Sequence, residues 1–329
     1  MNIGIIDSTI NKNWIAYGAK IVEEKNFAEL HKEKKECEIH KHGTLVINTV
    51  QKYSKKKNRY YICNVMNDVQ RGSSKAVLNA LKYLQTVEGL QIIIMSLCIS
   101  SLCNKREIDI RLKQLKRKGV IIFAAASNIE KGGYPAISPY VIGVGKDREI
   151  FDERIFFHKY AKIQVLANAY PEFISLGKGK YQIFMGSSKA VPMVVGTIIR
   201  LMHQKEYNKK DVICCLKQQG TKKSVRCLIN KSKKEKRFIE YSTDSEWIWE
   251  NIREFVREKY KSEFNYYEND FNMRITEITQ DINDIYKLLE FISKKQKKII
   301  DYDNITFNEF KTVGALYNYL TLCSRNEEI

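Results

Sequence analysis

Short apolar runs that alternate with helix-like segments constrain the fold of this 329-residue chain more than any other feature. Runs of this kind are typical of strands buried on both faces of a parallel sheet. Between them, apolar residues recur at helical spacing, and polar caps and glycines mark helix ends. The pattern predicts an α/β fold in which a parallel sheet with right-handed crossovers carries helices on both faces. The predicted strands lie at residues 3–6, 59–65, 91–97, 120–125 and the end of 134–145.

The last third of the chain has a different pattern, in which apolar residues repeat at the spacing of amphipathic helices. It predicts three or four helices in a small all-α domain at 245–325, after an α/β domain at 1–205. Between them, the lysine-rich residues 206–244 read as a basic linker or a hairpin extension with KSKKEKR at its tip. The repeating apolar residues are Trp247, Ile248, Ile252, Phe255, Val256 and Tyr260, then Ile278, Ile282, Ile285, Leu288, Leu289 and Ile292, then Val313, Leu316, Tyr317 and Leu320.

Charge and cysteine content narrow the functional classes. The formal charge of +18 comes mainly from lysines spread along the whole chain, so nucleic-acid binding is disfavoured. Only a steep salt dependence of DNA binding would support it. The eight cysteines lack a framework spacing, as expected of free thiols in a reducing compartment, and the N-terminus begins as a strand, not a signal peptide. No apolar run reaches membrane-spanning length, so we expect a cytoplasmic protein without a membrane partner.

A metal site is a minor alternative. Cys37, His40 and His42 are close in sequence and have metal-binding side chains. No second ligand pair with metal-site spacing occurs in the sequence, so we expect neither a metal nor another cofactor.

Three polar residues accompany the predicted strands and the helix that follows them. Asp7 ends the first apolar run, and Asn128 follows the run at 120–125. His42 stands before Gly-Thr and an apolar helical face. Open α/β sheets keep their chemistry at the carboxyl ends of their strands, although an aspartate there also caps ordinary turns. The three together therefore indicate a site.

The stretch YQIFMGSSKAVPMVVG, residues 181–196, adds an alcohol to this set. An apolar run leads into a Gly-Ser-Ser turn and then a helix. We expect Pro192 in the first helical turn, where its missing N–H would have no intrahelical partner anyway. The turn presents Ser188, and by chemistry alone Ser187 is an equal candidate. Taken singly, such a turn is also typical of an ordinary loop.

These motifs, in this order, resemble those of the subtilisin-like serine proteases. IIDST resembles the aspartate motif, HGT the histidine motif, AAASN the oxyanion motif and GSSKAVP the serine motif, and the resemblance covers residues 1–205. It implies a subtilisin-like fold and a catalytic triad of Asp7, His42 and Ser188, with Asn128 as an oxyanion donor. The register of the family selects Ser188 over Ser187.

The proposed residue types suit peptide hydrolysis. A neutral serine hydroxyl is a weak nucleophile, so His42 would take the proton of Ser188 during attack and later give it to the leaving amine. Asp7 would orient the imidazole and stabilise the imidazolium. The side-chain amide of Asn128 and the backbone N–H of Ser188 would donate to the oxyanion.

The resemblance also places the first specificity pocket. Its walls would be Ser96, Leu97 and Cys98 on one side and Ala125, Ala126 and Ser127 on the other. Cys98 and Ser127 stand where glycine is common in the family, so each adds a side chain. We expect a shallow pocket that prefers Gly, Ala or Ser before the cut bond, unless backbone shifts absorb both changes.

Four departures from the family pattern leave an alternative open. Thr9, Leu45, Asn48 and Lys189 differ from the usual residues beside the catalytic motifs, although none removes a catalytic group. The alternative is a catalytically weak or inactive peptide-binding protein of a maturation complex. No inhibitory propeptide precedes the first strand, so the chain is expected to fold without one, and no acidic cluster indicates a family calcium site.

The C-terminal part resembles acyl carrier proteins over two short segments, QDINDIYKLLEFI and DYDNITFNEFKTVGALYNYL. Asp281 stands near the place of the serine that bears phosphopantetheine, and an aspartate cannot carry that group. The resemblance therefore implies a docking module for a protein partner. Subtilisin-like proteases and carrier-related proteins both occur in peptide-maturation systems, which suggests leader removal from a ribosomal precursor peptide as a role.

Overall fold

The computed structural model describes residues 1–28, 42–66, 73–99, 102–128, 132–147, 150–204, 216, 245–261 and 270–323. The chain divides into two compact units. The first contains residues 1–170, 176–179 and 184–222, and the second contains 171–175, 180–183 and 223–329. The predicted basic linker or hairpin at 206–244 lies outside the described residues, apart from the buried Leu216.

An eight-stranded sheet forms the centre of the first unit, with strand order β2-β3-β1-β4-β5-β6-β8-β7. All neighbouring strands are parallel except the pair β7 and β8, which confirms the predicted α/β class with a mainly parallel sheet. The strands are β1 (Asn2–Asp7), β2 (Ala19–Asn26), β3 (Asn58–Asn64), β4 (Ile92–Met95), β5 (Ile121–Ala125), β6 (Ile142–Asp147), β7 (Ile155–Phe157) and β8 (Val165–Asn168).

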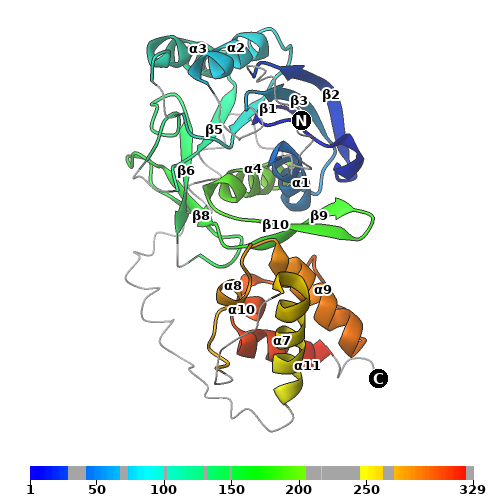
Figure 1. Ribbon diagram of the computed structural model, residues 1–329. Helices are drawn as coiled ribbons and strands as arrows, with labels where there is room; N and C mark the ends of the chain where they lie inside the picture. Colours follow the sequence, from blue (N-terminus) through cyan, green and yellow to red (C-terminus); the bar gives the residue numbers. More distant parts are fainter. Residues whose placement is uncertain are drawn as a thin grey trace. The chain divides into compact units, whose positions relative to one another are not determined.

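Helices cover both faces of this sheet (Figure 1). Helices α2 (Ser74–Leu84) and α3 (Lys105–Arg117) lie on one face, and α1 (His42–Ser54) and α4 (Ser187–Gln204) on the other. A short 3₁₀ helix, η1 (Lys12–Trp14), follows β1. Helices α1 and α4 pack closely at Gly196, where a Cβ would lie 2.7 Å from Cβ of Tyr53 and 2.8 Å from the carbonyl oxygen of Val50. Only glycine permits this approach.

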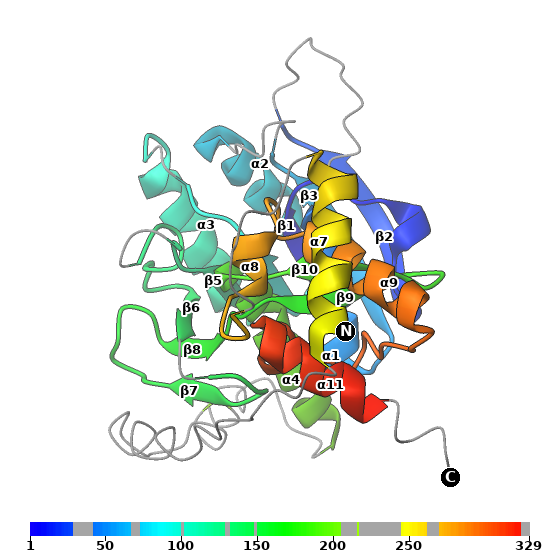
Figure 2. The same ribbon diagram turned by 60° about the horizontal axis from the view of Figure 1, so that its bottom comes forward.

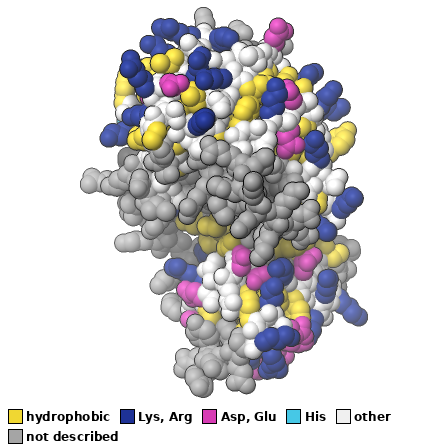
Figure 3. Space-filling view, turned by 45° about the horizontal axis from the view of Figure 1, so that its top comes forward, with side chains coloured by type: hydrophobic (Ala, Val, Ile, Leu, Met, Phe, Trp, Pro, Cys, Tyr) yellow, Lys and Arg dark blue, Asp and Glu magenta, His cyan; other side chains and the backbone are white. Residues whose placement is uncertain are grey.

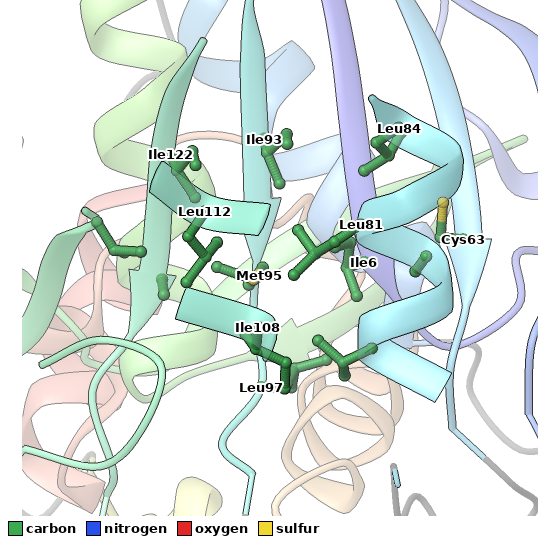
Figure 4. Close-up of a cluster of buried hydrophobic side chains, with 14 of the residues drawn as sticks. Ile6, Cys63, Leu81, Leu84, Ile93, Met95, Leu97, Ile108, Leu112 and Ile122 are labelled. Carbon is green, nitrogen blue, oxygen red and sulfur yellow. The ribbon is translucent and has the colours of Figure 1, made fainter. Parts of the chain in front are cut away.

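The core between the sheet and helices α2 and α3 explains the apolar runs. Side chains of both helices interdigitate with those of β1, β4 and β5 (Figure 4). Because helices cover both faces, consecutive strand residues are all buried, as in Ile92 to Met95. A parallel strand in this position needs apolar residues on both sides. The labelled members of this cluster are Ile6, Cys63, Leu81, Leu84, Ile93, Met95, Leu97, Ile108, Leu112 and Ile122.

The second unit contains the C-terminal helices, shown in Figure 2. They are α7 (Glu246–Tyr260), α8 (Ile275–Ile278), α9 (Asp284–Gln296), α10 (Phe307–Phe310) and α11 (Val313–Cys323), which confirms the predicted helical region. The apolar repeat from Ile278 to Ile292 does not form one continuous helix, because α8 ends at Ile278 and α9 begins at Asp284.

A two-stranded hairpin, β9 (Glu172–Gly177) and β10 (Lys180–Phe184), contributes to the second unit. Phe173 and Ile183 are buried in the same apolar cluster as the C-terminal helices, and Tyr181 packs against it. The second unit thus includes hairpin residues that lie within the predicted 1–205 domain. The reason is that this hairpin precedes α4 in sequence but packs with side chains more than 60 residues further on.

No helix among the described residues is long and apolar enough to cross a membrane. Lysine and arginine side chains are spread over the visible described surface, interspersed with acidic and apolar ones (Figure 3). This distribution fits the interpretation that the positive charge comes from a general lysine-rich composition.

Candidate active site

Asp7 is the last residue of β1, between strands β3 and β4, and its side chain is fully buried. Its Oδ1 atom accepts hydrogen bonds from the backbone N–H of Ser8 at 2.7 Å and from Nδ1 of His42 at 2.7 Å. The Oδ2 atom is buried and has no hydrogen-bond partner among the described residues. The buried carboxylate therefore has one oxygen committed to orienting the imidazole.

The Gly-Thr that follows His42 fastens the start of α1 to the loop after β1. A Cβ at Gly43 would lie 2.7 Å from the carbonyl oxygen of Ser8, so only glycine lets the helix come this close. The N–H of Gly43 donates to Oγ of Ser8 at 3.0 Å. Oγ1 of Thr44 accepts from the N–H of Asn11 at 2.8 Å. These contacts place His42 beside the strand end that carries the carboxylate.

The environment of His42 favours a protonated imidazole. Its side chain is 18% exposed, and this burial opposes the charged form. The charge of Asp7 and its hydrogen bond to Nδ1 outweigh burial and raise the pKa of His42 above its ordinary value. The ring of Phe184 packs edge-on against the imidazole, with 5.2 Å between centroids.

The turn before α4 places Ser188 in the first turn of that helix. Gly186 adopts a φ of +77°, which glycine accepts without strain, and its N–H donates to the carbonyl oxygen of Ala169 at 2.8 Å. Ser187 begins the helix, so the predicted place of Pro192 in the first turn is wrong: Pro192 is its sixth residue.

Pro192 has a specific consequence for Ser188. A residue at this position would normally donate its N–H to the carbonyl oxygen four residues earlier, which is that of Ser188, and proline has no such donor. Oγ of Ser96 donates to that carbonyl oxygen instead, at 2.9 Å. The helix start is thereby joined to the segment after β4.

The hydroxyl of Ser188 points toward the same segment. It donates to the carbonyl oxygen of Ser96 at 3.4 Å, and no hydrogen bond among the described residues joins it to His42. A change of χ1 rotamer redirects a serine hydroxyl without moving the backbone. The structure therefore contains a formed Asp7–His42 pair and a nucleophile candidate that is not yet bonded to it.

Ser187 and Asn128 form a separate pair. Ser187 is 1% exposed, whereas Ser188 is partly exposed. The N–H and the hydroxyl of Ser187 both donate to Oδ1 of Asn128, at 3.1 and 3.2 Å. Nζ of Lys146 donates to the carbonyl oxygen of Asn128 at 3.0 Å. Burial and bonding favour Ser188 over Ser187 as the accessible hydroxyl.

The two predicted pocket walls lie side by side because β4 and β5 are parallel neighbours. Sγ of Cys98 lies 3.5 Å from the carbonyl oxygen of Ala125. A Cβ at Gly133 would lie 2.9 Å from Cβ of Ser127 and 3.1 Å from Sγ of Cys98. The side chains of Cys98 and Ser127 therefore converge on one point. Ser96, Leu97, Ala125 and Ala126 are buried, and Cys98 is exposed.

Two of the four departures have structural explanations. Asn48 is buried, and its amide accepts from the N–H of Ala16 at 2.9 Å and donates to the carbonyl oxygen of Trp14 at 2.7 Å. Lys189 is fully buried, with Nζ 3.3 Å from Oδ1 of Asn168 at the end of β8. Both residues tie a helix of the site to a neighbouring loop or strand.

Sequence reasoning missed Phe184 and Asn168. Nothing in the sequence near either residue indicates its partner, because His42 and Lys189 lie 142 and 21 positions away. Among the described residues no group of three or more His, Cys, Asp or Glu side chains could hold a metal ion. Cys37 and His40, of the alternative metal cluster, lie outside the described residues.

A scan of protein-family models finds no match for this chain, and a search of the curated proteins finds none. Among solved structures, the chain is similar to a cold-adapted subtilisin-like serine proteinase, with a TM-score of 0.51 and 20% identity over 66% of this chain and 81% of that one. It is also similar to the prenylagaramide maturation protease PagA, with a TM-score of 0.51 and 17% identity over 70% of this chain and 89% of that one. The first unit, with its parallel sheet and flanking helices, therefore has a subtilisin-like fold.

Proposed function

We propose that the chain is a serine endopeptidase that uses Asp7, His42 and Ser188 as its catalytic triad. The observation that carries this proposal is the 2.7 Å hydrogen bond between a fully buried carboxylate and His42 at the carboxyl end of a subtilisin-like sheet. An aspartate with only a structural role does not require a hydrogen bond from a histidine side chain. A histidine held through Nδ1 keeps Nε2 for a serine, as a general base requires.

The chemistry follows from this arrangement. Once the hydroxyl of Ser188 turns from the carbonyl of Ser96 to Nε2 of His42, the imidazole takes its proton while Oγ attacks the peptide carbonyl carbon. The imidazolium then gives the proton to the leaving amine, and an acyl-enzyme remains on Ser188. Water, deprotonated by His42, releases the acyl group. The hydrogen bond between a serine hydroxyl and its general base is often long or poorly aligned in the free enzyme and tightens when substrate binds.

Two donors would stabilise the oxyanion of each tetrahedral intermediate. With Oδ1 of Asn128 accepting from Ser187, Nδ2 is the group of that amide left to donate. The backbone N–H of Ser188, in the first turn of α4, is the second donor.

We propose a shallow first specificity pocket, because Cys98 and Ser127 both contact the space beside Gly133. The preferred residue before the cut bond is Gly, Ala or Ser. A peptide library digested by the protein and read by mass spectrometry tests this preference. Cleavage after Phe or Leu would contradict it.

A fluorophosphonate probe tests the function itself. It should label the wild-type protein and fail to label Ser188→Ala, because it reacts only with an activated serine. Ser187→Ala is the matched control and should retain labelling, because the backbone N–H of residue 187 still donates to Oδ1 of Asn128. Labelling of Ser188→Ala equal to that of wild type would contradict the assignment.

The second candidate function is a catalytically silent peptide-binding protein. The bond between the hydroxyl of Ser188 and the carbonyl oxygen of Ser96 favours it, because that hydroxyl is not activated as it stands. Failed labelling together with retained peptide binding would support this function. Labelling would exclude it.

The substrate we propose is a ribosomal precursor peptide whose leader is removed. The structural similarity to a maturation protease supports this class of substrate. The helical unit would act as a docking module for a protein partner, as its resemblance to carrier proteins suggests. Cleavage of a candidate precursor at a single site, seen by mass spectrometry, would test the role. The buried free thiol of Cys63 fits a reducing, cytoplasmic location.

A further inference from the structure

Phe184 makes an aromatic contact with the imidazole on which the proposed mechanism depends. Its side chain is 5% exposed, and its ring lies edge-to-face with that of His42, with 5.2 Å between the centroids and an interplanar angle of 85°. Aromatic rings favour this geometry. Both residues belong to the first compact unit, so the contact joins the end of β10 to the start of α1 within that unit.

The hydrogen bond to Asp7 fixes only one atom of the imidazole. Nδ1 of His42 lies 2.7 Å from Oδ1 of Asp7. Rotation about the Cβ–Cγ bond of a histidine has broad energy minima, so this bond alone leaves the ring plane free to tilt. A ring packed against the imidazole restricts that tilt. Asp7 and Phe184 are therefore complementary restraints, one on the position of Nδ1 and the other on the ring plane.

Phe184 also lies on the short segment that leads into α4 and the proposed nucleophile. The N–H of Gly186 donates to the carbonyl oxygen of Ala169 at 2.8 Å. The N–H of Ser187 donates to Oδ1 of Asn128 at 3.1 Å. A Cβ at Gly186 would lie 3.1 Å from the same oxygen, so the backbone also packs closely against that amide. The ring that contacts the imidazole and the proposed nucleophile thus belong to one restrained segment.

We propose that Phe184 is a positioning residue for His42, whose imidazole plane it holds in the orientation that lets Nε2 receive the proton of Ser188. Because Phe184 and Ser188 share a restrained segment, the contact aligns the imidazole with the alcohol, whereas the hydrogen bond to Asp7 aligns it with the acid. The catalytic meaning of this inference rests on the proposed function.

The test uses the full chain and three variants. Phe184→Leu keeps an apolar side chain but removes the ring, and Phe184→Tyr keeps the ring. Phe27→Leu is the matched control, because it makes the same change in a ring of the first unit that packs against Tyr83 of helix α2. If Phe184→Leu does not fold, Phe184→Met provides another apolar side chain without a ring.

Two readouts are compared among variants that thermal unfolding shows to be folded. The first is the rate of fluorophosphonate labelling. The second is the downfield proton resonance of Nδ1–H between His42 and Asp7, which a purely structural role of Phe184 would leave unchanged.

We expect Phe184→Leu to be labelled about tenfold to a hundredfold more slowly than wild type, because small misplacements of a catalytic group are costly. Its Nδ1–H resonance should broaden or shift, because the imidazole is less restrained. Phe184→Tyr should recover most of the labelling rate and the wild-type resonance. Phe27→Leu should match wild type in both readouts.

The outcomes separate this inference from the proposed function. An unchanged resonance in Phe184→Leu would overturn the positioning role, whether or not labelling is slower. Equal losses in Phe184→Tyr and Phe184→Leu would also overturn it, because the ring would then not be the feature that matters. If wild type is not labelled but its resonance changes in Phe184→Leu and not in Phe27→Leu, the hydrolase function fails while the positioning of His42 stands.

Discussion

The two sides of the candidate site are built differently. On one side, the loop after β1 and the start of α1 are joined by hydrogen bonds of 2.7 to 3.0 Å through Asp7, Ser8 and His42. On the other side, the start of α4 is held through its backbone, and the Ser188 hydroxyl makes only a 3.4 Å bond to a carbonyl. The Asp7–His42 pair is thus assembled in the free protein, whereas the hydroxyl of Ser188, the proposed nucleophile, would still have to turn toward it.

This difference indicates which side of the site is preorganised in the free protein. Orienting a buried imidazole needs a fixed partner, since its charged form is costly to bury alone. A serine hydroxyl needs only a rotamer change to become active. Variants on the first side should therefore affect activity more than variants on the second.

The largest expected effect comes from Asp7→Asn. The substitution removes the charge that stabilises the imidazolium, and it replaces one carboxylate oxygen with an NH2 donor that favours the wrong tautomer of His42. We expect the labelling or hydrolysis rate to fall on the order of 10³- to 10⁴-fold. A loss below tenfold in a folded variant would mean that the preassembled pair does not act in catalysis.

The pH dependence of activity should reflect protonation of His42 in the same Asp7–His42 pair. The pKa of His42 is raised above its ordinary value of 6.5, because the effect of Asp7 outweighs that of burial. Catalysis needs the neutral imidazole, so kcat/KM should fall on the acid side with a half-maximal point above pH 6.5. Stability follows the opposite sign: the protonated pair stabilises the folded state below the unfolded pKa, and this contribution is lost as pH rises through the folded value. A midpoint below pH 6.5 would contradict the raised pKa.

Gly43→Ala tests the packing of the first side. The added Cβ would lie 2.7 Å from a backbone oxygen of Ser8, which cannot move away alone. We expect the free energy of unfolding to fall by about 1 to 3 kcal/mol, with loss of labelling. Urea unfolding measures the change. Gly119→Ala is the control, since its Cβ meets nothing within 4 Å and only its φ of +82° causes strain, about 1 kcal/mol. Equal labelling of both variants would show that the helix start tolerates displacement.

Ser96→Ala tests the second side. It removes the hydroxyl that donates to the carbonyl oxygen of Ser188. Pro192 has no N–H to donate to that oxygen in its place. We expect about 1 kcal/mol loss in the free energy of unfolding, because one buried hydrogen bond is lost. The labelling rate should change less than in Gly43→Ala. A larger loss of labelling in Ser96→Ala than in Gly43→Ala would contradict the contrast between the two sides.

The smallest effect is expected from Lys189→Met. Burying an ammonium costs desolvation energy, which its bond to Asn168 offsets in part, and methionine fills a similar volume. The free energy of unfolding should change by about 1 kcal/mol or less, measured by urea unfolding. A loss of several kcal/mol would instead make Lys189 a main anchor of α4.

Much of the fold and the identity of the candidate residues could be predicted from local patterns. Apolar runs such as 91–97 marked the buried strands, and strand ends marked Asp7 and Asn128, since both signals come from neighbours in sequence. Pro192 was misplaced because where α4 begins depends on a turn at Gly186, whose φ of +77° is not visible in the sequence. Phe184 was missed because its partner is 142 positions away.

The amino-acid sequence by itself determined the alternation of strands and helices and the order of the acid, the imidazole, the amide and the alcohol along the chain. Periodicity and chain order are local properties, so they can be read without coordinates. Only the tertiary structure decided that Ser187 is buried while Ser188 is partly exposed, that the hydroxyl of Ser188 bonds to Ser96, and that the hairpin before α4 packs with the C-terminal helices. Each of these depends on the packing of side chains from distant segments, which no local pattern encodes.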